Sequence, residues 1–387
     1  MSVTSAQGFV ASGVACGLKS GGGKDLALVV NQGPEYTAAA VTTSNRVCAA
    51  PVEWTRQAVS DGTLHAVVLN SGGANACTGD GGFEDTVATA HLVARGLHLA
   101  PGDIAVCSTG LIGERLDMVA IRTGIELAIG AASRSGGEDA AEAIMTTDTV
   151  AKTAARTLES GVTIGGMAKG AGMLAPQLAT MLVVITTDAS LTGSQAREAL
   201  AHAVEYSFNR IDSDGCMSTN DTVVLLASGA AGVSPDLAEF TEGLTVVAKD
   251  LAAQLIGDAE GASHDIAVEV IGASSQRAGV EVARSVARSN LLKAAIFGND
   301  PNWGRILSSI GTVPEVVAPF DPHAVDVAIN GVLVCKNGGI GEPRESVDMT
   351  PRQCTITIDL KAGPEAVTLL TNDLTYDYVT ENSAYSS

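Results

Sequence analysis

The sequence is poor in aromatic residues, in basic residues and in long apolar segments. Aromatic residues make up 3% of its 387 positions, and Lys plus Arg number 23 against 43 Asp plus Glu, for a formal net charge of −20. A surface of this charge repels polyanions, which excludes nucleic acid and anionic membrane surfaces as expected partners. No segment reaches the roughly 18 uncharged apolar residues of a spanning helix, and the opening "MSVTSAQGFV" lacks the features of a signal peptide. We therefore expect a cytoplasmic protein.

The cysteines and histidines form no recognisable metal or disulfide pattern. The seven cysteines are odd in number and contain no C-x-x-C pair, which favours buried free thiols over a disulfide or zinc framework. The six histidines are isolated from one another, without an H-E-x-x-H motif. Distant His, Ser and Asp residues could still meet in the folded chain. The sequence therefore predicts no metal site.

What the sequence does contain is mostly small and aliphatic. Its hydrophobic fraction of 46% consists largely of Ala and Val, and 43 Gly are placed among strands and turns. This composition is typical of a tightly packed α/β or α+β enzyme. A chain of this length can form two or three domains. We expect short connections between them, because no repeat, low-complexity tract or long polar linker is present.

Local patterns predict strands and helices along the whole chain. Residues 64–76, "LHAVVLNSGGANA", and 104–113, "IAVCSTGLIG", each indicate a strand that ends in a Gly-rich loop, where active-site groups are commonly presented. Thr192 and Gln195 have the spacing of a capping box at the start of a helix. Asn330-Gly331 indicates a hairpin turn. The remaining patterns predict helices over 235–258 and 275–290, and strands over 264–274, 354–360 and 366–375. The class is α/β or α+β.

Two Gly-containing stretches partly resemble a phosphate-binding loop and a calcium-binding loop, but neither has the full motif. Residues 19–30, "KSGGGKDLALVV", lack the spacing of a phosphate-binding loop and lead into a strand instead of a helix. Residues 212–223, "DSDGCMSTNDTV", begin like a calcium loop, but Cys216 occupies the fifth position and Val223 the twelfth, where a Glu is needed. Neither stretch is expected to bind its ligand.

Thr180 lies at the start of an apolar run in residues 174–185, "LAPQLATMLVVI". The run is rich in β-branched residues and too short for a helix, so it predicts a buried strand. Lys169 and several small residues precede it, which allows close backbone approach. These residues alone leave Thr180 either an ordinary strand threonine or a nucleophile.

The whole chain resembles the bifunctional ornithine acetyltransferase family of arginine biosynthesis (glutamate N-acetyltransferase, ArgJ). The motifs that carry the resemblance are "LNSGGANACTG", "VCSTGLIG", "AIMTTDT", "GGMAKGAGMLAPQLATML", "STNDTV", "GDAEGA", "DPNWGRI" and "DLTYDYVTENSAYSS", in this order. Ala171 stands where the family often has Ser, and Ser387 where it often has Thr. Both changes are conservative in size, and the second keeps a hydroxyl.

The resemblance implies a precursor that cleaves itself between Ala179 and Thr180, giving an α chain of residues 1–179 and a β chain of residues 180–387. Thr180 is the implied nucleophile. Its new α-amino group, with an unperturbed pKa of roughly 7.7–8.0, can act as general base for its own hydroxyl, so no histidine is needed. The Thr109 hydroxyl and the Gly110 backbone N–H are the implied oxyanion hole.

The implied reaction is a ping-pong transfer of an acetyl group from N-acetylornithine to glutamate, which releases ornithine and N-acetylglutamate. No metal or organic cofactor is implied, and acetyl-CoA is a second donor if the enzyme is bifunctional. The implied substrate-binding residues, besides Thr180, are Lys169, Thr146 or Thr147 with Thr146 preferred, Glu260, Asn382 and Ser387. Alternatively, Lys169 and Glu260 form a structural ion pair and the C-terminal residues are a packed terminus.

The family fold implied here is a layered α/β sandwich similar to, but not homologous with, the N-terminal-nucleophile hydrolases, assembled as an α2β2 heterotetramer. We expect a catalytic layer over about 1–190, a middle segment over 191–280 and a C-terminal segment over 281–387. Alternatives are an N-terminal-nucleophile-like amidase or aminopeptidase, an inactive ligand-binding or structural relative, and a paralogue of a specialised pathway. The retention of Thr180, Thr109, Gly110 and Lys169 argues against an inactive relative.

Overall fold

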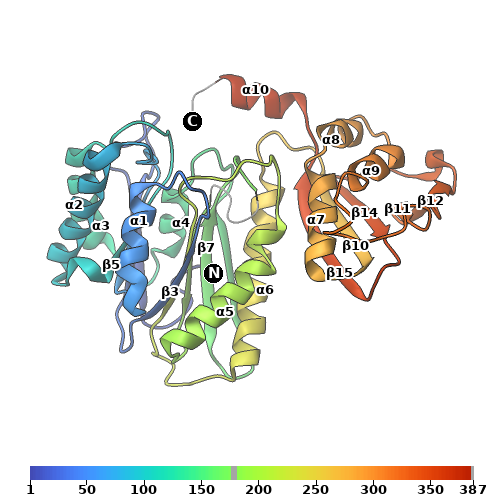
Figure 1. The fold of residues 1–387 in the computed structure, drawn as a ribbon. Coiled ribbons are helices and arrows are strands. Elements are labelled where there is room, and N and C mark those ends of the chain that lie inside the picture. Colours follow the sequence, from blue (N-terminus) through green and yellow to red (C-terminus); the bar gives the residue numbers. More distant parts are fainter. Residues whose placement is uncertain (176–180, 385–387) are drawn as a thin grey trace. The chain divides into compact units, whose positions relative to one another are not determined.

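The computed structural model describes residues 1–175 and 181–384 of the chain. The chain divides into two compact units, which are coloured along the sequence in Figure 1. Of the described residues, the first unit contains 1–175, 181–209 and 216–258, and the second contains 210–215 and 259–384. The expected cleavage point at Ala179 and Thr180, and the C-terminal Ser387, lie outside the described residues.

Two β-sheets form the centre of the first unit. The four-stranded sheet has the order β1-β2-β4-β5, and the five-stranded sheet has the order β3-β9-β8-β7-β6. Their strands are β1 (Phe9–Val14), β2 (Leu26–Asn31), β4 (Ala66–Asn70), β5 (Ile104–Ser108), β3 (Thr37–Thr42), β9 (Thr222–Ala227), β8 (Leu182–Thr187), β7 (Thr163–Lys169) and β6 (Lys152–Thr157).

Helices cover the outer faces of both sheets. In Figure 1, α2 and α3 lie on one side of the first unit and α5 and α6 on the other, so the layers run helix, sheet, sheet, helix. The helices of this unit are α1 (Ala50–Ala58), α2 (Gly79–Leu97), α3 (Met118–Ala131), α4 (Gly137–Ala143), α5 (Gly193–Glu205) and α6 (Leu237–Gly257). This layered sandwich confirms the fold class expected from the sequence.

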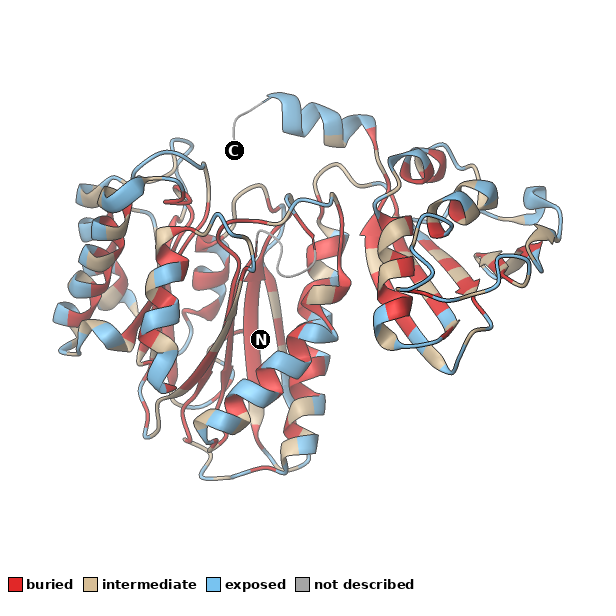
Figure 2. Cartoon of the chain, in the orientation of Figure 1, coloured by how far each residue is buried: buried red, intermediate tan, exposed pale blue. Residues whose placement is uncertain are grey.

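Alternation of side chains along the strands builds the layers. In β2, Leu26 and Leu28 pack in the core beneath α2 and α3, whereas Ala27 and Val29 pack in the core between the sheets. Successive strand residues point to opposite faces, so both faces of a central strand must be apolar to be buried on both sides. All six residues of β8 and of β9 are buried, and Figure 2 shows burial along the strands of this unit.

The second unit is a single six-stranded sheet with helices. Its strand order is β13-β12-β11-β14-β10-β15, and α7 packs on β10 and β15. The elements are β10 (Asp265–Ala273), α7 (Gln276–Ala287), α8 (Asn290–Phe297), α9 (Trp303–Ile310), β11 (Asp326–Ile329), β12 (Val332–Lys336), β13 (Gly339–Ile340), β14 (Gln353–Asp359), β15 (Glu365–Asn372) and α10 (Tyr376–Ala384). The unit has its own apolar core, built from one face of the sheet and the helices.

The elements expected from strong local signals are confirmed. The capping box at Thr192 and Gln195 begins α5, and Asn330 and Gly331 form the β11–β12 turn with φ of 47° and 84°. The expected helices correspond to α6 and α7, and the expected strands to β4, β5, β8, β10, β14 and β15.

The loop before β2 also agrees with the rejection of a phosphate site. The backbone N–H groups of Gly17, Leu18 and Lys19 all donate to the buried Asp25 carboxylate, which occupies the position that an anion would take.

The division into units differs from the three segments expected at 1–190, 191–280 and 281–387. Helices α5 and α6 belong to the first unit because α5 packs on β3, and α6 packs on β6 and β7. Strand β10 belongs to the second unit because it pairs with β14 and β15 along most of its length. Packing between elements distant in sequence therefore decides the boundary at Asp258.

The cysteines match their expected chemistry only in part. All seven are free thiols, but Cys77 and Cys216 are exposed instead of buried. Both lie in loops and not in the strand cores that bury Cys107, Cys335 and Cys354. Separately, no helix within residues 1–175 and 181–384 is long and apolar enough to cross a membrane.

Candidate active site

The ends of β4 and β5 bring two loops together at one edge of the four-stranded sheet. The strands are parallel neighbours, with Asn70 opposite Ser108, so their carboxyl ends meet. Past this point, Thr109 N–H donates to Asn70 O and Gly73 N–H donates to Thr109 O, each at 3.0 Å. These bonds hold the two Gly-rich loops against each other.

Gly110 adopts a backbone conformation that only glycine adopts readily. Its φ is 130°, and a Cβ at this position would lie 2.8 Å from Gly73 N. No hydrogen bond among the described residues uses the Gly110 N–H. The loop therefore presents a backbone donor without an acceptor in this part of the chain.

Thr109 and Lys169 lie together beside that donor. The Lys169 Nζ donates to the Thr109 Oγ1 at 3.4 Å, and both side chains are buried. The Thr109 hydroxyl has no acceptor of its own among the residues described. The structure thus brings the implied oxyanion-hole residues and the implied carboxylate-binding lysine into one site.

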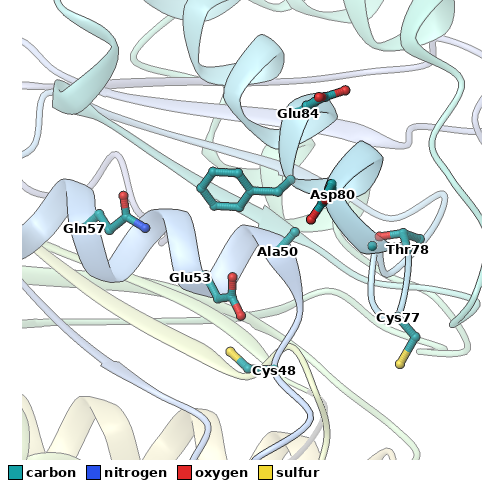
Figure 3. Close-up of a pocket in the computed structure, with 10 residues that line it drawn as sticks. Cys48, Ala50, Glu53, Gln57, Cys77, Thr78, Asp80 and Glu84 are labelled. Carbon is teal, nitrogen blue, oxygen red and sulfur yellow. The ribbon is translucent and has the colours of Figure 1, made fainter.

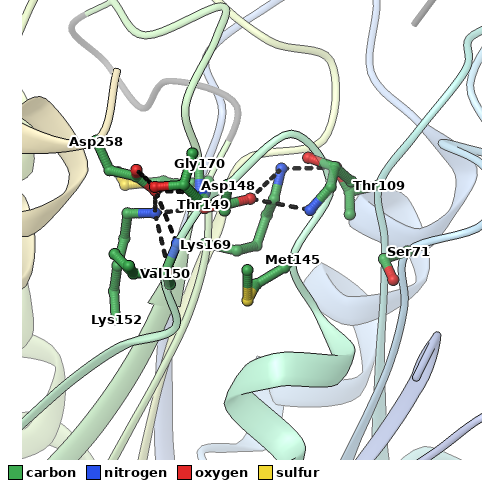
Figure 4. A network of polar contacts seen from close by, with 12 residues as sticks. Ser71, Thr109, Met145, Asp148, Thr149, Val150, Lys152, Lys169, Gly170 and Asp258 are labelled. Atoms are coloured by element: carbon green, nitrogen blue, oxygen red, sulfur yellow. Dashed lines mark hydrogen bonds and ion pairs between the residues drawn. The ribbon is translucent and has the colours of Figure 1, made fainter. Parts of the chain in front are cut away.

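A buried ionic network continues from Lys169 (Figure 4). The Asp148 carboxylate lies 4.0 Å from Lys169 Nζ and accepts a hydrogen bond from Lys152 Nζ at 2.6 Å. Lys152 also donates to Asp258 at 2.5 Å. Burial by itself would raise the pKa of Asp148, but Lys169, Lys152 and hydrogen bonds lower it to about 2. Asp148 is therefore ionised throughout the neutral pH range.

Thr146 and Thr147 lie in the loop that carries Asp148, and both are half-buried. The Thr146 N–H donates to Asp148 Oδ2 at 2.9 Å, which ties this loop to the network around Lys169. Both hydroxyls stay candidates for contact with the substrate.

The start of β8 is held by Asp221, which precedes β9. Met181 N–H donates to Asp221 Oδ1 at 3.0 Å, and Thr222 N–H donates to Met181 O at 3.2 Å. The second oxygen, Asp221 Oδ2, is buried without a hydrogen-bond partner in the described part of the chain. Burial raises the pKa of Asp221 well above its ordinary value, although the Met181 amide and Lys169 act in the opposite direction.

Glu260 and Asn382 lie in the second unit. The Asn382 side-chain amide, on α10, donates to Glu260 Oε2 at 2.9 Å. Glu260 lines a pocket of about 180 Å³ together with Asp214, Lys293 and Asp373. Acidic side chains outnumber the single lysine among these residues, so the pocket favours a cationic group.

Another pocket, of about 610 Å³, lies in the first unit between α1 and the beginning of α2 (Figure 3). Glu53 from α1 and Asp80 and Glu84 from α2 line it, with Cys48 and Cys77 from the adjoining loops. None of the unpaired buried polar atoms of the described residues lies among its lining residues. We assign it no function. Within residues 1–175 and 181–384, no group of three or more His, Cys, Asp and Glu side chains is arranged to hold a metal ion.

The sequence analysis missed four charged residues of the first unit. Asp148, Lys152, Asp221 and Asp258 form or adjoin the buried network, yet none was predicted as a site residue. Three of them lie inside the motifs "AIMTTDT", "STNDTV" and "GDAEGA" or directly at their ends. The aspartates within these motifs were the sequence signal that could have identified them as site residues.

Comparison with known proteins identifies the family. The ArgJ family model matches residues 10–387. The arginine biosynthesis bifunctional protein ArgJ of Streptomyces avermitilis is 61% identical over 387 residues, which are 100% of each chain. The protein of the same name from Thermobifida fusca is 57% identical, again over 100% of each chain. An ornithine acetyltransferase of Mycobacterium tuberculosis, solved in complex with ornithine, is 51% identical over 47% of this chain and 96% of that chain, with a TM-score of 0.45. The chain belongs to the ArgJ family of enzymes.

Proposed function

We propose that the chain is a self-processing acetyltransferase that moves an acetyl group from N2-acetyl-L-ornithine to L-glutamate in arginine biosynthesis. Family membership supports the pathway. The observation that carries the chemistry is the pair of donors at Thr109 and Gly110, which have no acceptor among the described residues and lie beside the buried Lys169. Such preorganised donors suit the oxyanion of an acyl-transfer intermediate.

The first proposed step is self-cleavage before Thr180. The Thr180 hydroxyl attacks the Ala179 carbonyl carbon, so that a C–O bond forms while the C–N bond breaks and the hydroxyl proton passes to the departing amine. Water then hydrolyses the ester, which leaves a carboxylate on Ala179 and a free α-amino group on Thr180. The small side chain of Ala179 leaves room for the attack.

The second proposed step is acetyl transfer through an acetyl-threonine. The Thr180 α-amine removes the proton of its own hydroxyl, which attacks the acetyl carbonyl of N-acetylornithine, and ornithine leaves with the proton. The glutamate α-amine then attacks the carbonyl of the acetyl-threonine, so that a C–N bond forms while the C–O bond to Thr180 breaks, and the amine proton returns to the Thr180 hydroxyl as N-acetylglutamate leaves. The Thr109 hydroxyl and the Gly110 N–H stabilise the oxyanion in both halves of the reaction.

Substrate binding follows from what N-acetylornithine and glutamate share, an α-carboxylate and an α-nitrogen. In our proposal, Lys169 binds the α-carboxylate, and the hydroxyl of Thr146 or Thr147 adds a hydrogen bond. Glu260 receives the side-chain ammonium of ornithine, which is supported by the acidic lining of its pocket. Asn382 and Ser387 contribute polar groups from the C-terminal residues.

Two further features belong to this proposal. Acetyl-CoA acts as a second acetyl donor, which fits the word bifunctional in the names of the relatives. The processed chains assemble as an α2β2 heterotetramer. The reaction needs no metal or organic cofactor, because the threonine amine and hydroxyl supply both base and nucleophile.

Intact mass and acceptor dependence test the proposed function together. We expect the purified wild-type protein to give two chains split before Thr180, and Thr180→Ala to give one inactive chain. With N-acetylornithine alone, at most one equivalent of ornithine should be released per site, and continued release should require glutamate. Continued release without glutamate would instead identify an amidase, in which water takes the acetyl group. A full-length wild-type chain that transfers acetyl groups would refute the free-amine mechanism.

A further inference from the structure

Asp148 is the point at which three segments of the first unit meet. Its Oδ1 accepts hydrogen bonds from Lys152 Nζ at 2.6 Å and from Gly170 N–H at 2.7 Å, and its Oδ2 accepts one from Thr146 N–H at 2.9 Å. The Lys169 ammonium lies 4.0 Å from Oδ2. The Asp148 side chain is fully buried. A single carboxylate therefore holds the 146–148 loop and the end of β7 in one arrangement.

The network around Asp148 balances its charges. Lys152 opens β6 and Lys169 closes β7, and because these antiparallel strands pair Lys152 with Ala168, both ammonium groups lie at the same end of the sheet. Asp258 accepts from Lys152 and from the Thr149 hydroxyl and backbone amide. Two carboxylates thus face two ammonium groups. Because each charge has an opposite charge beside it, the free-energy cost of burying the network is partly offset.

The two carboxylates differ in what they reach. Asp258 contacts Lys152 and residues 149–150. Asp148 contacts Lys152 too, but it also reaches both sides of the candidate substrate site, through the Thr146 amide on one side and through Lys169 and the Gly170 amide on the other. Figure 4 shows Lys169 between Asp148 and Thr109. An ion pair that served only the fold would need no contact with these site residues.

We infer that Asp148 is a positioning residue for substrate recognition, which fixes the Lys169 ammonium and the Thr146 loop where a substrate α-carboxylate binds. This inference rests on the proposed function, because it takes Lys169 as the carboxylate-binding cation. Asp148 does not touch the substrate in this scheme. Its effect on binding must therefore pass through Lys169, and this dependence can be measured.

A double-mutant cycle between Asp148 and Lys169 tests the inference. Asp148→Asn keeps the size of the side chain and removes its charge, and Lys169→Met removes the ammonium. We expect Asp148→Asn to weaken ornithine binding, measured as Kd by titration calorimetry, by about tenfold in the wild-type background and by less than about threefold in the Lys169→Met background. The KM for N-acetylornithine should rise in parallel, with a smaller change in kcat.

Two matched variants separate positioning from structural support. Asp258→Asn removes the other carboxylate of the network and should change Kd by less than about threefold, because Asp258 does not reach Lys169. Asp148→Asn combined with Lys152→Met removes one carboxylate and one ammonium, so that the buried network keeps equal numbers of the two charges, with Lys169 and Asp258 remaining. This double variant should fold, as judged by thermal melting, and should keep the weak Kd of Asp148→Asn.

Three results would overturn the role of Asp148. They are an equal loss in both Lys169 backgrounds, a Kd restored to the wild-type value by Lys152→Met, and an equally large loss from Asp258→Asn. Failure of the proposed function is recognised separately. If the wild-type protein binds ornithine but transfers no acetyl group to glutamate, the proposed transferase function is wrong. The double-mutant cycle can still be evaluated in that case, because it is measured as the Kd for ornithine.

Discussion

Two buried carboxyl groups of the first unit have pKa values shifted in opposite directions, because their partners differ. Asp148 accepts from two backbone amides and lies near two ammonium groups, which lower its pKa to about 2 despite burial. Asp221 accepts a hydrogen bond from one amide, and its other oxygen has no hydrogen-bond partner within the described structure. Burial therefore outweighs the favourable contacts and raises its pKa. Residue type alone therefore does not decide the direction in which the pKa of a buried aspartate shifts.

The raised pKa of Asp221 predicts a stability that falls as the pH rises. The folded chain keeps this proton to higher pH than the unfolded chain, so the stability from Asp221 is fully present below its ordinary pKa of 3.8 and is lost as the pH rises toward the folded pKa. Asp221→Asn keeps an oxygen for the Met181 amide and removes the titration. In a Thr180→Ala background, we expect Asp221→Asn to gain stability relative to its parent by about 1 kcal/mol per pH unit in this window.

Urea unfolding at a series of pH values checks this expectation. The exposed Glu242, changed to Gln in the same background, is the control for loss of one carboxylate. A difference between Asp221→Asn and its parent that does not vary with pH would show that Asp221 is ionised in the folded chain.

The Thr109 hydroxyl permits a second prediction at the residue scale. Thr109→Val keeps the shape of this buried side chain and removes the donor, so kcat for acetyl transfer should fall by about 10²-fold. Thr109→Ser keeps the hydroxyl and should retain most of the activity. Steady-state kinetics with N-acetylornithine and glutamate measure both. Equal losses in the two variants would mean that packing, and not hydrogen bonding, explains the effect.

At the scale of elements, the site is built where strands end. β4 and β5 present the Thr109 loop, β7 ends at Lys169, and β6 begins at Lys152. α6 packs on β6 and β7 and thereby supports the strands that carry both lysines. The stability of α6 should consequently affect the stability of the first unit more than the chemistry of the site.

The N-cap of α6 tests this relation. The Asp236 carboxylate accepts from the Ala238 and Glu239 amides at 2.9 and 3.2 Å. Asp236→Ala should lower the free energy of unfolding by about 1 kcal/mol, because the cap and the favourable charge at the helix start are both lost. Glu242→Ala removes an exposed carboxylate from the same helix without removing a cap and should change stability by less than about 0.5 kcal/mol.

Circular dichroism during urea unfolding measures both variants, and kcat should stay near wild type in each. A loss from Glu242→Ala as large as that from Asp236→Ala would assign the effect to charge instead of capping.

At the scale of the whole molecule, the two products of the proposed cleavage each contribute strands to one sheet. In the order β3-β9-β8-β7-β6, strands β8 and β9 belong to residues 180–387 and lie between β3 and β7 of residues 1–179. Their registers pair six residues of β3 with β9 and six of β7 with β8. Cutting one peptide bond leaves these ladders intact.

We therefore expect the two processed chains to stay together under native conditions. Gel filtration should give one peak that contains both, with a mass near twice 39.1 kDa if the α2β2 assembly forms. Denaturing chromatography should separate them. The uncleaved Thr180→Ala chain should elute at the native position of the wild type and give a single chain on denaturation. Elution of either product alone would contradict the shared sheet.

Helices and strands with strong local sequence features were predicted, and those without such features were not. α5, α6 and the β11–β12 hairpin were expected because caps, apolar periodicity and an Asn-Gly turn are local features. No helix was predicted over α2, whose buried face consists largely of Gly, Thr and Ala with an aspartate. Such a face lacks the apolar periodicity that marks an amphipathic helix, and it is recognisable only once the helix is packed on α3 and β5.

The sequence by itself determined the fold class, the strong local elements and the family, because these depend on residue patterns and motif order. Only the tertiary structure decided which charges share the site. Lys152 and Asp258 are 106 positions apart, and Lys169 and Thr109 are 60 apart, yet each pair is in hydrogen-bond contact. Electrostatic interactions depend on distance in space and on burial. The charge state of Asp148 and its link to Lys169 therefore follow from packing, and no spacing along the chain predicts them.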